Sequence, residues 1–334
     1  MTKVLISEKY LHDIANAIRV KLDSQSTYTP AQMAAAIADI TGSISGTITP
    51  STDADKVLVT DSSLTAIANA IRTKLDVLTT YTPAQMADAI LSITASAPVP
   101  TIVPWASGTD EEIAAMIDAA QAGTIDLQQD GGWAVGDVRT IVVDSFTDGA
   151  GMTHAQQSID IAITSFDEYM SCGNVMQFDF RDALSNGIRI NSESTTVGGY
   201  GGSEMKTTTL PSLVNAMPSW MKNRMIEFSV LAGSGYSSFT LETVTGNKLA
   251  LRSEIEIFGS STYSVTGEGA LLDYYTSSAN INKKMGHSGS DAYYWWLRSP
   301  RKIGDGEFVC VRSGSSVYTN GAAAVQGVAP FGCL

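Results

Sequence analysis

Side chains that carry catalysis or bind metals are few and scattered in this chain of 334 residues. The histidines His12, His154 and His287 are isolated, so no H-x-x-x-H or H-E-x-x-H set exists to hold a catalytic zinc ion. The G-x-S-x-G pattern of a serine nucleophile is also absent, because the chain offers only Gly286-His287-Ser288-Gly289. We predict no catalytic residue, no metal ligand and no cofactor, and therefore a protein that is not an enzyme.

Three other patterns suggest a phosphate-binding loop, a disulfide or zinc site and a calcium site, but the residues argue against each. The glycine-rich stretch 198–202 is followed by Lys206-Thr207, but Met205 stands where a phosphate-binding loop needs glycine. The cysteines Cys172, Cys310 and Cys333 are odd in number and far apart, which argues against a disulfide scaffold or a thiolate zinc site. Three aspartates could hold calcium, but a solvated face is the favoured interpretation for each: Asp179, Asp182 and Asp305.

The composition excludes two classes of partner. The net charge is −13, and an acidic surface repels phosphate backbones, so we expect no nucleic-acid binding. No window approaches the roughly 18 apolar residues of a membrane helix, so we expect no membrane insertion. The first residues lack the apolar run of a signal peptide, which indicates synthesis in a cytoplasm.

The elements that would position a binding site lie at the end of the chain. Residues 293–297 are four aromatics and a leucine, which leave no polar face, so we predict a strand covered on both sides and ended by Pro300. Further strands are expected at 307–312, 316–319 and 325–329. Trp295 and Trp296 are assigned to the core, and Arg298 is expected to pair with Glu254 or Glu256 across it. Residues 249–258 are expected to form a strand.

The same stretch resembles a known family. The sequence Trp295-Trp296-Leu297-Arg298-Ser299-Pro300, then Phe308, Val311 and Gly314, and Gly327-Val328 before Pro330, is similar to the C-terminal signature of DUF6273-type domains. The resemblance extends upstream to about residue 126. It implies a C-type-lectin-like module of the kind found in phage tail proteins and bacterial surface proteins. The family's arginine before the last proline is replaced by Ala329.

The loops of this module are the predicted binding site. Arg301, Lys302 and Asp305 lie between the first two strands, and further polar residues follow the second. Tyrosine gives contact area at low entropic cost, while serine and asparagine supply hydrogen bonds. Ordinary hairpin loops remain the alternative interpretation. The predicted ligand-binding residues are Tyr293, Arg301, Lys302, Asp305, Ser313, Ser315, Tyr318 and Asn320.

The first hundred residues contain a tandem repeat with a spacing of 53 residues. Apolar residues recur at helical spacing, and Thr29-Pro30-Ala31-Gln32 is a capping box with proline at the first helical position. We therefore predict a hairpin of two short helices in each copy. One hairpin is too small to be stable alone and needs the other copy, another chain or a neighbouring protein. The pattern resembles a repeat of phage tail and baseplate proteins. Matching positions are Leu11/Leu64, Ile14/Ile67, Pro30/Pro83 and Met33/Met86.

These elements define an α+β fold, with tandem helical-hairpin repeats followed by a C-type-lectin-like mixed α+β domain. The predicted parts are repeat 1 at 1–45, a linker with repeat 2 at 46–97, a proline-rich linker with a lead-in helix at 98–125, and the lectin-like domain at 126–334. The lead-in helix is indicated by the capping box Thr109-Asp110-Glu111-Glu112.

The resemblance implies a structural protein of a phage tail fibre, located in the virion. Its C-terminal domain would bind a host cell-surface glycan or protein, and residues 1–97 would contact other tail or baseplate proteins and form a homotrimer. The alternatives are a bacterial or prophage-encoded surface adhesin and a purely structural baseplate or decoration protein. A glycan hydrolase would need two carboxylates about 5–9 Å apart in a cleft, which the sequence does not place.

Overall fold

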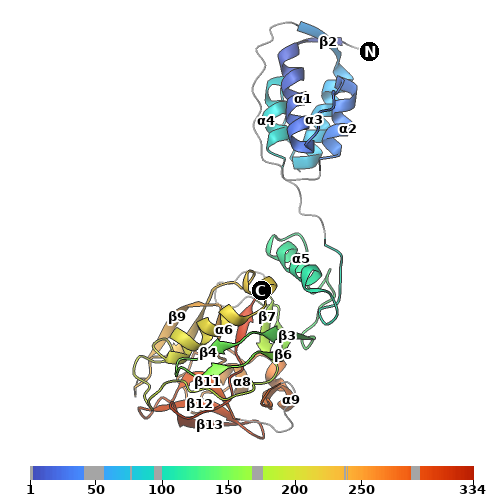
Figure 1. The fold of residues 1–334 in the computed structure, drawn as a ribbon. Coiled ribbons are helices and arrows are strands. Elements are labelled where there is room, and N and C mark those ends of the chain that lie inside the picture. Colours follow the sequence, from blue (N-terminus) through green and yellow to red (C-terminus); the bar gives the residue numbers. More distant parts are fainter. Residues whose placement is uncertain are drawn as a thin grey trace. The chain divides into compact units, whose positions relative to one another are not determined.

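The computed structural model describes residues 3–40, 56–75, 77–93, 100–167, 176–236, 238, 240–286 and 294–334. The chain divides into two compact units, Met1–Val99 and Pro100–Leu334. The division falls inside the proline-rich segment expected to separate the repeats from the C-terminal domain. Both units combine helices with strands, as the α+β prediction required (Figure 1). No helix among the described residues is long and apolar enough to cross a membrane.

The N-terminal unit repeats one order of elements, a strand followed by two helices. The first set is β1 (Lys3–Ser7), α1 (Glu8–Leu22) and α2 (Pro30–Ala38). The second set is β2 (Lys56–Thr60), α3 (Asp61–Leu75) and α4 (Pro83–Leu91). Capping boxes place the starts of α2 and α4, with the backbone N–H groups of Thr29 and Thr82 each donating to a glutamine Oε1 at 2.9 Å. The helices were predicted, and the strand before each pair was not.

The two copies are related by an approximate twofold axis. Strands β1 and β2 pair antiparallel, with Leu5 opposite Leu58, Lys3 opposite Thr60 and Ser7 opposite Lys56. Leu5 and Leu58 are the same position of the repeat, because they are 53 residues apart. A residue therefore faces its own repeat equivalent at the centre of the ladder, as in the self-complementary interface of a twofold dimer.

The helices also pack between the two copies. Helix α1 packs chiefly against α4, and α2 against α3, while the two helices of one copy contact each other less. The core of this unit contains equivalent buried residues from both copies, including Ile14 with Ile67 and Ile37 with Ile90. Of the partners left open by the sequence, the structure shows the other copy. The predicted hairpin within each copy is thus replaced mainly by packing between copies.

The C-terminal unit begins with α5 (Asp110–Gln121) at the predicted capping box. Thr109 Oγ1 accepts a hydrogen bond from the Glu112 backbone N–H at 3.3 Å, and Glu112 Oε2 accepts one from the Thr109 N–H at 2.9 Å. A five-stranded antiparallel sheet follows, in the order β10-β14-β7-β6-β3. Its strands are β3 (Val138–Val143), β6 (Gln157–Ser165), β7 (Gln177–Phe180), β10 (Leu249–Ala250) and β14 (Phe331–Cys333).

A second sheet holds the aromatic strand, in the order β11-β12-β13. Its strands are β11 (Trp295–Pro300), β12 (Glu307–Arg312) and β13 (Ser316–Gly321). All six residues of β11 are buried, which confirms that this strand is covered on both faces. The indole N–H groups of Trp295 and Trp296 donate to the carbonyls of Ile281 and Ile188 at 3.0 and 2.9 Å. The predicted strand at 325–329 is replaced by isolated bridges at Gln326 and Gly327, and β14 lies further on.

Shorter elements complete this unit. Strand pairs β4 (Phe146–Thr147) with β5 (Thr153–His154), and β8 (Phe228–Gly233) with β9 (Leu241–Asn247), form two small sheets. The helical segments are a π-helix η1 (Met205–Thr209), α6 (Leu210–Ala216), α7 (Ser219–Lys222), α8 (Glu254–Phe258), a 3-10 helix η2 (Asp273–Thr276) and α9 (Ser278–Ile281). The strand predicted over 249–258 is wrong beyond Ala250, because Ser253 and Glu256 form a capping box that starts α8.

Candidate binding surface and the buried polar cluster

The predicted ligand-binding residues do not form one site, because β12 separates them. Arg301, Lys302 and Asp305 lie in the β11–β12 loop, and Asn320 is close to them because it pairs with Phe308 at the start of β12. Ser313 and Ser315 lie in the turn at the opposite end of that strand. Six strand residues span roughly 20 Å, so one small ligand cannot contact both ends.

The remaining predicted residues have other surroundings. Tyr318 lies in the middle of β13, opposite Cys310, with its ring 6.3 Å from that of Tyr294 in an edge-to-face arrangement. The Ser315 hydroxyl donates to the carbonyl of Ser278 at 3.1 Å, which joins this turn to α9. Tyr293 lies outside the described residues.

The β11–β12 loop is joined to two other loops by hydrogen bonds of Thr196. The Thr196 N–H donates to the Asp305 carbonyl at 3.0 Å, and the Tyr236 N–H donates to the Thr196 hydroxyl at 2.9 Å. Contact is close enough that a Cβ on Gly306 would lie 2.5 Å from the Ser194 carbonyl oxygen. Three segments distant in sequence therefore form one surface.

Exposed apolar side chains gather on these three loops. Val197, Tyr236 and Ile303 are 60%, 61% and 64% exposed, one on each loop. Beside them, the Lys302 ammonium donates to the Ser261 carbonyl at 2.9 Å, and Arg301 pairs with Glu307. We call this the loop surface: Val197, Tyr236, Arg301, Lys302, Ile303, Asp305 and Asn320.

Tyr236 is held in a strained backbone conformation. Its φ is +49°, a left-handed region that bulky residues seldom adopt. The Thr196 hydroxyl and a bond from the Ser238 N–H to the Gly235 carbonyl at 3.2 Å hold this turn. Strain of this kind at an exposed aromatic is typical of functional positions. The sequence signal was present, since Tyr236 stands in a stretch of serine and glycine, the composition of adaptable binding loops.

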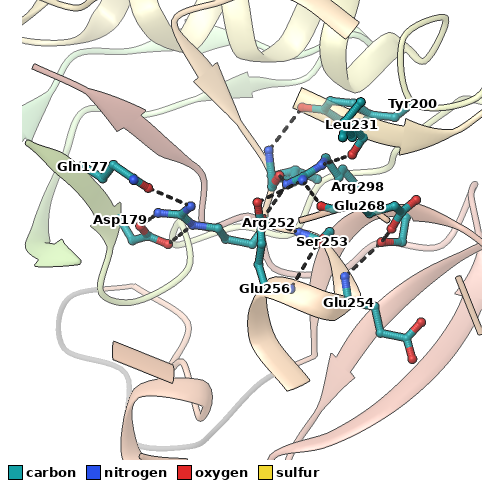
Figure 2. Close-up of polar contacts among 12 residues, drawn as sticks. Gln177, Asp179, Tyr200, Leu231, Arg252, Ser253, Glu254, Glu256, Glu268 and Arg298 are labelled. Carbon is teal, nitrogen blue, oxygen red and sulfur yellow. Dashed lines mark hydrogen bonds and ion pairs between the residues drawn. The ribbon is translucent and has the colours of Figure 1, made fainter. Parts of the chain in front are cut away.

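Arg298 is the centre of a fully buried polar cluster, shown in Figure 2. Its guanidinium donates to both Glu256 oxygens at 2.6 and 3.0 Å, and to the carbonyls of Leu231, Leu251 and Glu268 at 2.7–2.9 Å. The pairing with Glu256 confirms one of the two predicted partners. Glu254 is buried but accepts instead from the backbone N–H groups of Tyr263 and Ser264, at 3.0 and 2.7 Å.

A second buried ion pair was missed by sequence reasoning. Arg252 donates to both oxygens of Asp179 at 2.6 and 2.9 Å, and Asp179 also accepts from the hydroxyls of Thr164 and Tyr275 at 2.7 and 2.5 Å. Burial alone would raise the pKa of Asp179, but the charge and hydrogen bonds of Arg252 outweigh it and lower the pKa. Asp179 is therefore a charged structural residue without access to solvent, and the favoured interpretation that it lies on a solvated face is wrong.

These buried groups are unsuited to acting on a substrate. Their donors and acceptors are turned toward one another in Figure 2, and the side chains of Asp179, Arg252, Glu256 and Arg298 are at most 1% exposed. Within the described part of the chain, no group of three or more His, Cys, Asp or Glu side chains could hold a metal ion. The candidate site is accordingly the loop surface, whose arrangement suits binding by contact.

Comparison with known proteins agrees with part of the resemblance. Residues 178–334 match the model of the family described as Domain of unknown function (DUF6273). The match begins within β7 and ends at the last residue. It therefore contains the β8–β9 and β11–β12–β13 sheets, beside which the loop surface lies, and both buried arginines. No curated protein matches the chain, and no solved structure matches it. The C-type-lectin-like architecture therefore stays a prediction.

Proposed function

We propose that the DUF6273-like region is a binding module that attaches to a host cell-surface glycan or protein through the loop surface. The observation that carries this proposal is the presence of three exposed apolar side chains on three loops that are tied together by hydrogen bonds. Apolar patches rimmed by polar residues are typical of interaction sites. Tyr236 is the expected anchor, since tyrosine and arginine side chains commonly dominate binding energy.

The proposal extends to the whole chain. By the resemblance of its repeats and its last domain, it is a structural protein of a phage tail fibre in the virion, with a C-type-lectin-like C-terminal module. The N-terminal unit would contact other tail or baseplate proteins and hold the chains as a homotrimer. Three copies would multiply many weak contacts into firm attachment. The alternatives of a surface adhesin and of a baseplate or decoration protein use the same loop surface for different partners.

The test is retention of the purified full chain on bacterial cell walls from a panel of hosts. We expect the parent to be retained without releasing soluble sugar, and the double variant Tyr236→Ser/Ile303→Ser to be retained at least ten-fold less. The matched control is Ser313→Asp, at the opposite end of β12, which should bind as the parent does. Both changes are at exposed residues, so the variants should fold alike, which tryptophan fluorescence can verify.

Three outcomes would contradict the proposal. Equal retention of the double variant would remove the loop surface as the site. Release of sugar by the parent would show a hydrolase. Absence of retention on every host wall, combined with capture of another tail protein through Tyr236 and Ile303, would favour the purely structural role.

A further inference from the structure

A pocket that shares no residue with the loop surface concentrates positive charge in an acidic protein. It has a volume of about 320 Å³ and lies between the helical segments η1, α6 and α7 and the turn that joins β9 to β10. Lys206, Lys222 and Lys248 line it, with Glu227 as its one acidic lining residue. Three positive charges against one negative stand out in a chain whose net charge is −13.

The lysines retain the capacity to bind a ligand. The Lys206 ammonium donates to the Gly246 carbonyl at 3.0 Å, and the Lys222 ammonium donates to the Asn215 carbonyl at 3.0 Å. An ammonium has three donors, so each keeps two for a further acceptor. The Lys248 ammonium has no acidic partner within the described residues. Carbonyl bonds hold two of the charges in place without neutralising them.

Asn247 adds a second observation in the same pocket. Its side chain is buried, and its amide nitrogen donates to the carbonyls of Phe228 and Val244 at 3.1 and 2.7 Å. These two bonds use both amide donors and fix the orientation of the group. The Oδ1 atom is left buried without a partner, which is unusual and costly in a folded protein. A hydroxyl group of a ligand would satisfy this acceptor.

The local backbone also departs from regular structure. Lys206 lies in the π-helix Met205–Thr209, a rare conformation that is frequent at functional sites. The next residues, Leu210, Pro211 and Val214 of α6, give the pocket an apolar wall suited to the carbon face of a polyol or sugar. The pocket therefore combines three lysines for a phosphate, the Asn247 Oδ1 atom for a hydroxyl and an apolar wall for a carbon face.

We propose that this pocket binds a phosphorylated polyol or sugar, with the phosphate held by the three lysines and a hydroxyl donating to Asn247 Oδ1. The site is independent of the loop surface, because none of its residues belongs to that surface. Its ligand class is defined by one anionic phosphate together with at least one neighbouring hydroxyl.

The experiment is calorimetric titration of the full chain with sn-glycerol 3-phosphate at low salt. We expect measurable binding that weakens as salt is added, because the three lysines are only partly buried and their charges are screened by ions in solution. Lys248→Gln should weaken binding about ten-fold through loss of a charge-assisted hydrogen bond. The matched control is Lys284→Gln, which removes an exposed lysine outside the pocket and should leave binding unchanged.

Two further probes define the ligand class. Glycerol alone should bind far more weakly, since it lacks the phosphate, and inorganic phosphate should bind more weakly, since it lacks the polyol. No binding of glycerol phosphate by the parent, or equal binding by Lys248→Gln, would overturn the proposal. Equal binding of inorganic phosphate would overturn the assigned class by showing an anion site only. The cell-wall result for Tyr236→Ser/Ile303→Ser is a separate readout, so either idea can fail alone.

Discussion

The two units of this chain achieve a stable core in opposite ways. The N-terminal unit pairs two copies of one sequence, and its core consists of equivalent apolar residues such as Ile14 and Ile67. The C-terminal unit has no such repetition and encloses charged side chains that are at most 1% exposed: Asp179, Arg252, Glu254, Glu256, Glu268, Lys283 and Arg298. In the N-terminal unit the stabilising contacts are therefore distributed over many equivalent apolar residues. In the C-terminal unit a few buried ion pairs make a large contribution.

The largest expected effect is that of Arg298→Ala. The substitution removes five hydrogen bonds and leaves the Glu256 carboxylate buried without its cation, which costs about 3–5 kcal/mol of unfolding free energy. Denaturant unfolding followed by tryptophan fluorescence measures it selectively, because all five tryptophans lie in the C-terminal unit.

The control for Arg298→Ala is Asp118→Asn. Asp118 accepts from Arg224 at 2.6 Å, but its side chain is 54% exposed. Exposed ion pairs contribute at most about 1 kcal/mol, so the two variants should differ several-fold. Similar losses of unfolding free energy in both variants would show that the buried ion pair of Arg298 contributes no more than an exposed one. The claim that buried ion pairs stabilise the C-terminal unit would then fail.

How far the sequence predicted these features depends on the range of the interaction. Capping signals placed the starts of α2, α4 and α5, because they involve residues three apart. Another local signal was overlooked: Ser253 and Glu256 have the same spacing and start α8, where a strand had been predicted. That helix turns Glu256 toward Arg298 and leaves Glu254 to bond backbone N–H groups.

The interactions that sequence reasoning missed are those between distant segments. Apolar periodicity indicated which face of each N-terminal helix is buried but not that the face packs on the other copy. Arg252 and Asp179 are 73 residues apart, and no local pattern relates them. Likewise, Thr196 links the loops of Val197 and Tyr236 to Asp305, so sequence reasoning predicted the part of the loop surface in and beside the β11–β12 loop and missed Val197 and Tyr236.

An intermediate effect is expected for Ile14→Ala and Ile67→Ala, which are equivalent positions of the two copies. Both side chains are fully buried, and truncating a buried isoleucine costs about 2–5 kcal/mol. The approximate twofold axis predicts that the two losses are equal within about 1 kcal/mol. Amide hydrogen exchange of α1 and α3 measures the loss in this unit separately.

The decisive observation is which helices lose protection from amide exchange in each variant. Loss of protection should reach α4 in Ile14→Ala and α2 in Ile67→Ala, because the helices pack across copies. If each variant loosens only the helices of its own copy, each copy unfolds as a separate hairpin. Packing between the copies would then not be what stabilises the N-terminal unit.

The smallest of the three effects concerns Glu268 and changes with pH. Burial raises the pKa of Glu268 from 4.5 to about 7, although hydrogen bonds from Ser299 and Gly233 and the charge of Arg298 oppose the shift. Between pH 4.5 and pH 7 the folded protein binds more protons at this carboxyl than the unfolded chain does. The contribution of Glu268 to stability is therefore greatest below pH 4.5 and falls as the pH rises to 7. The loss amounts to at most about 3 kcal/mol.

Glu268→Gln isolates this contribution, because the amide does not titrate while every other group still does. Unfolding free energy should fall between pH 5 and pH 8 by up to about 3 kcal/mol more in the parent than in the variant, measured by tryptophan fluorescence in denaturant. Comparing pH dependences cancels any constant cost of the substitution. The same slope in both proteins would mean that Glu268 is charged throughout this range, held so by Arg298 and Ser299 as Asp179 is by Arg252.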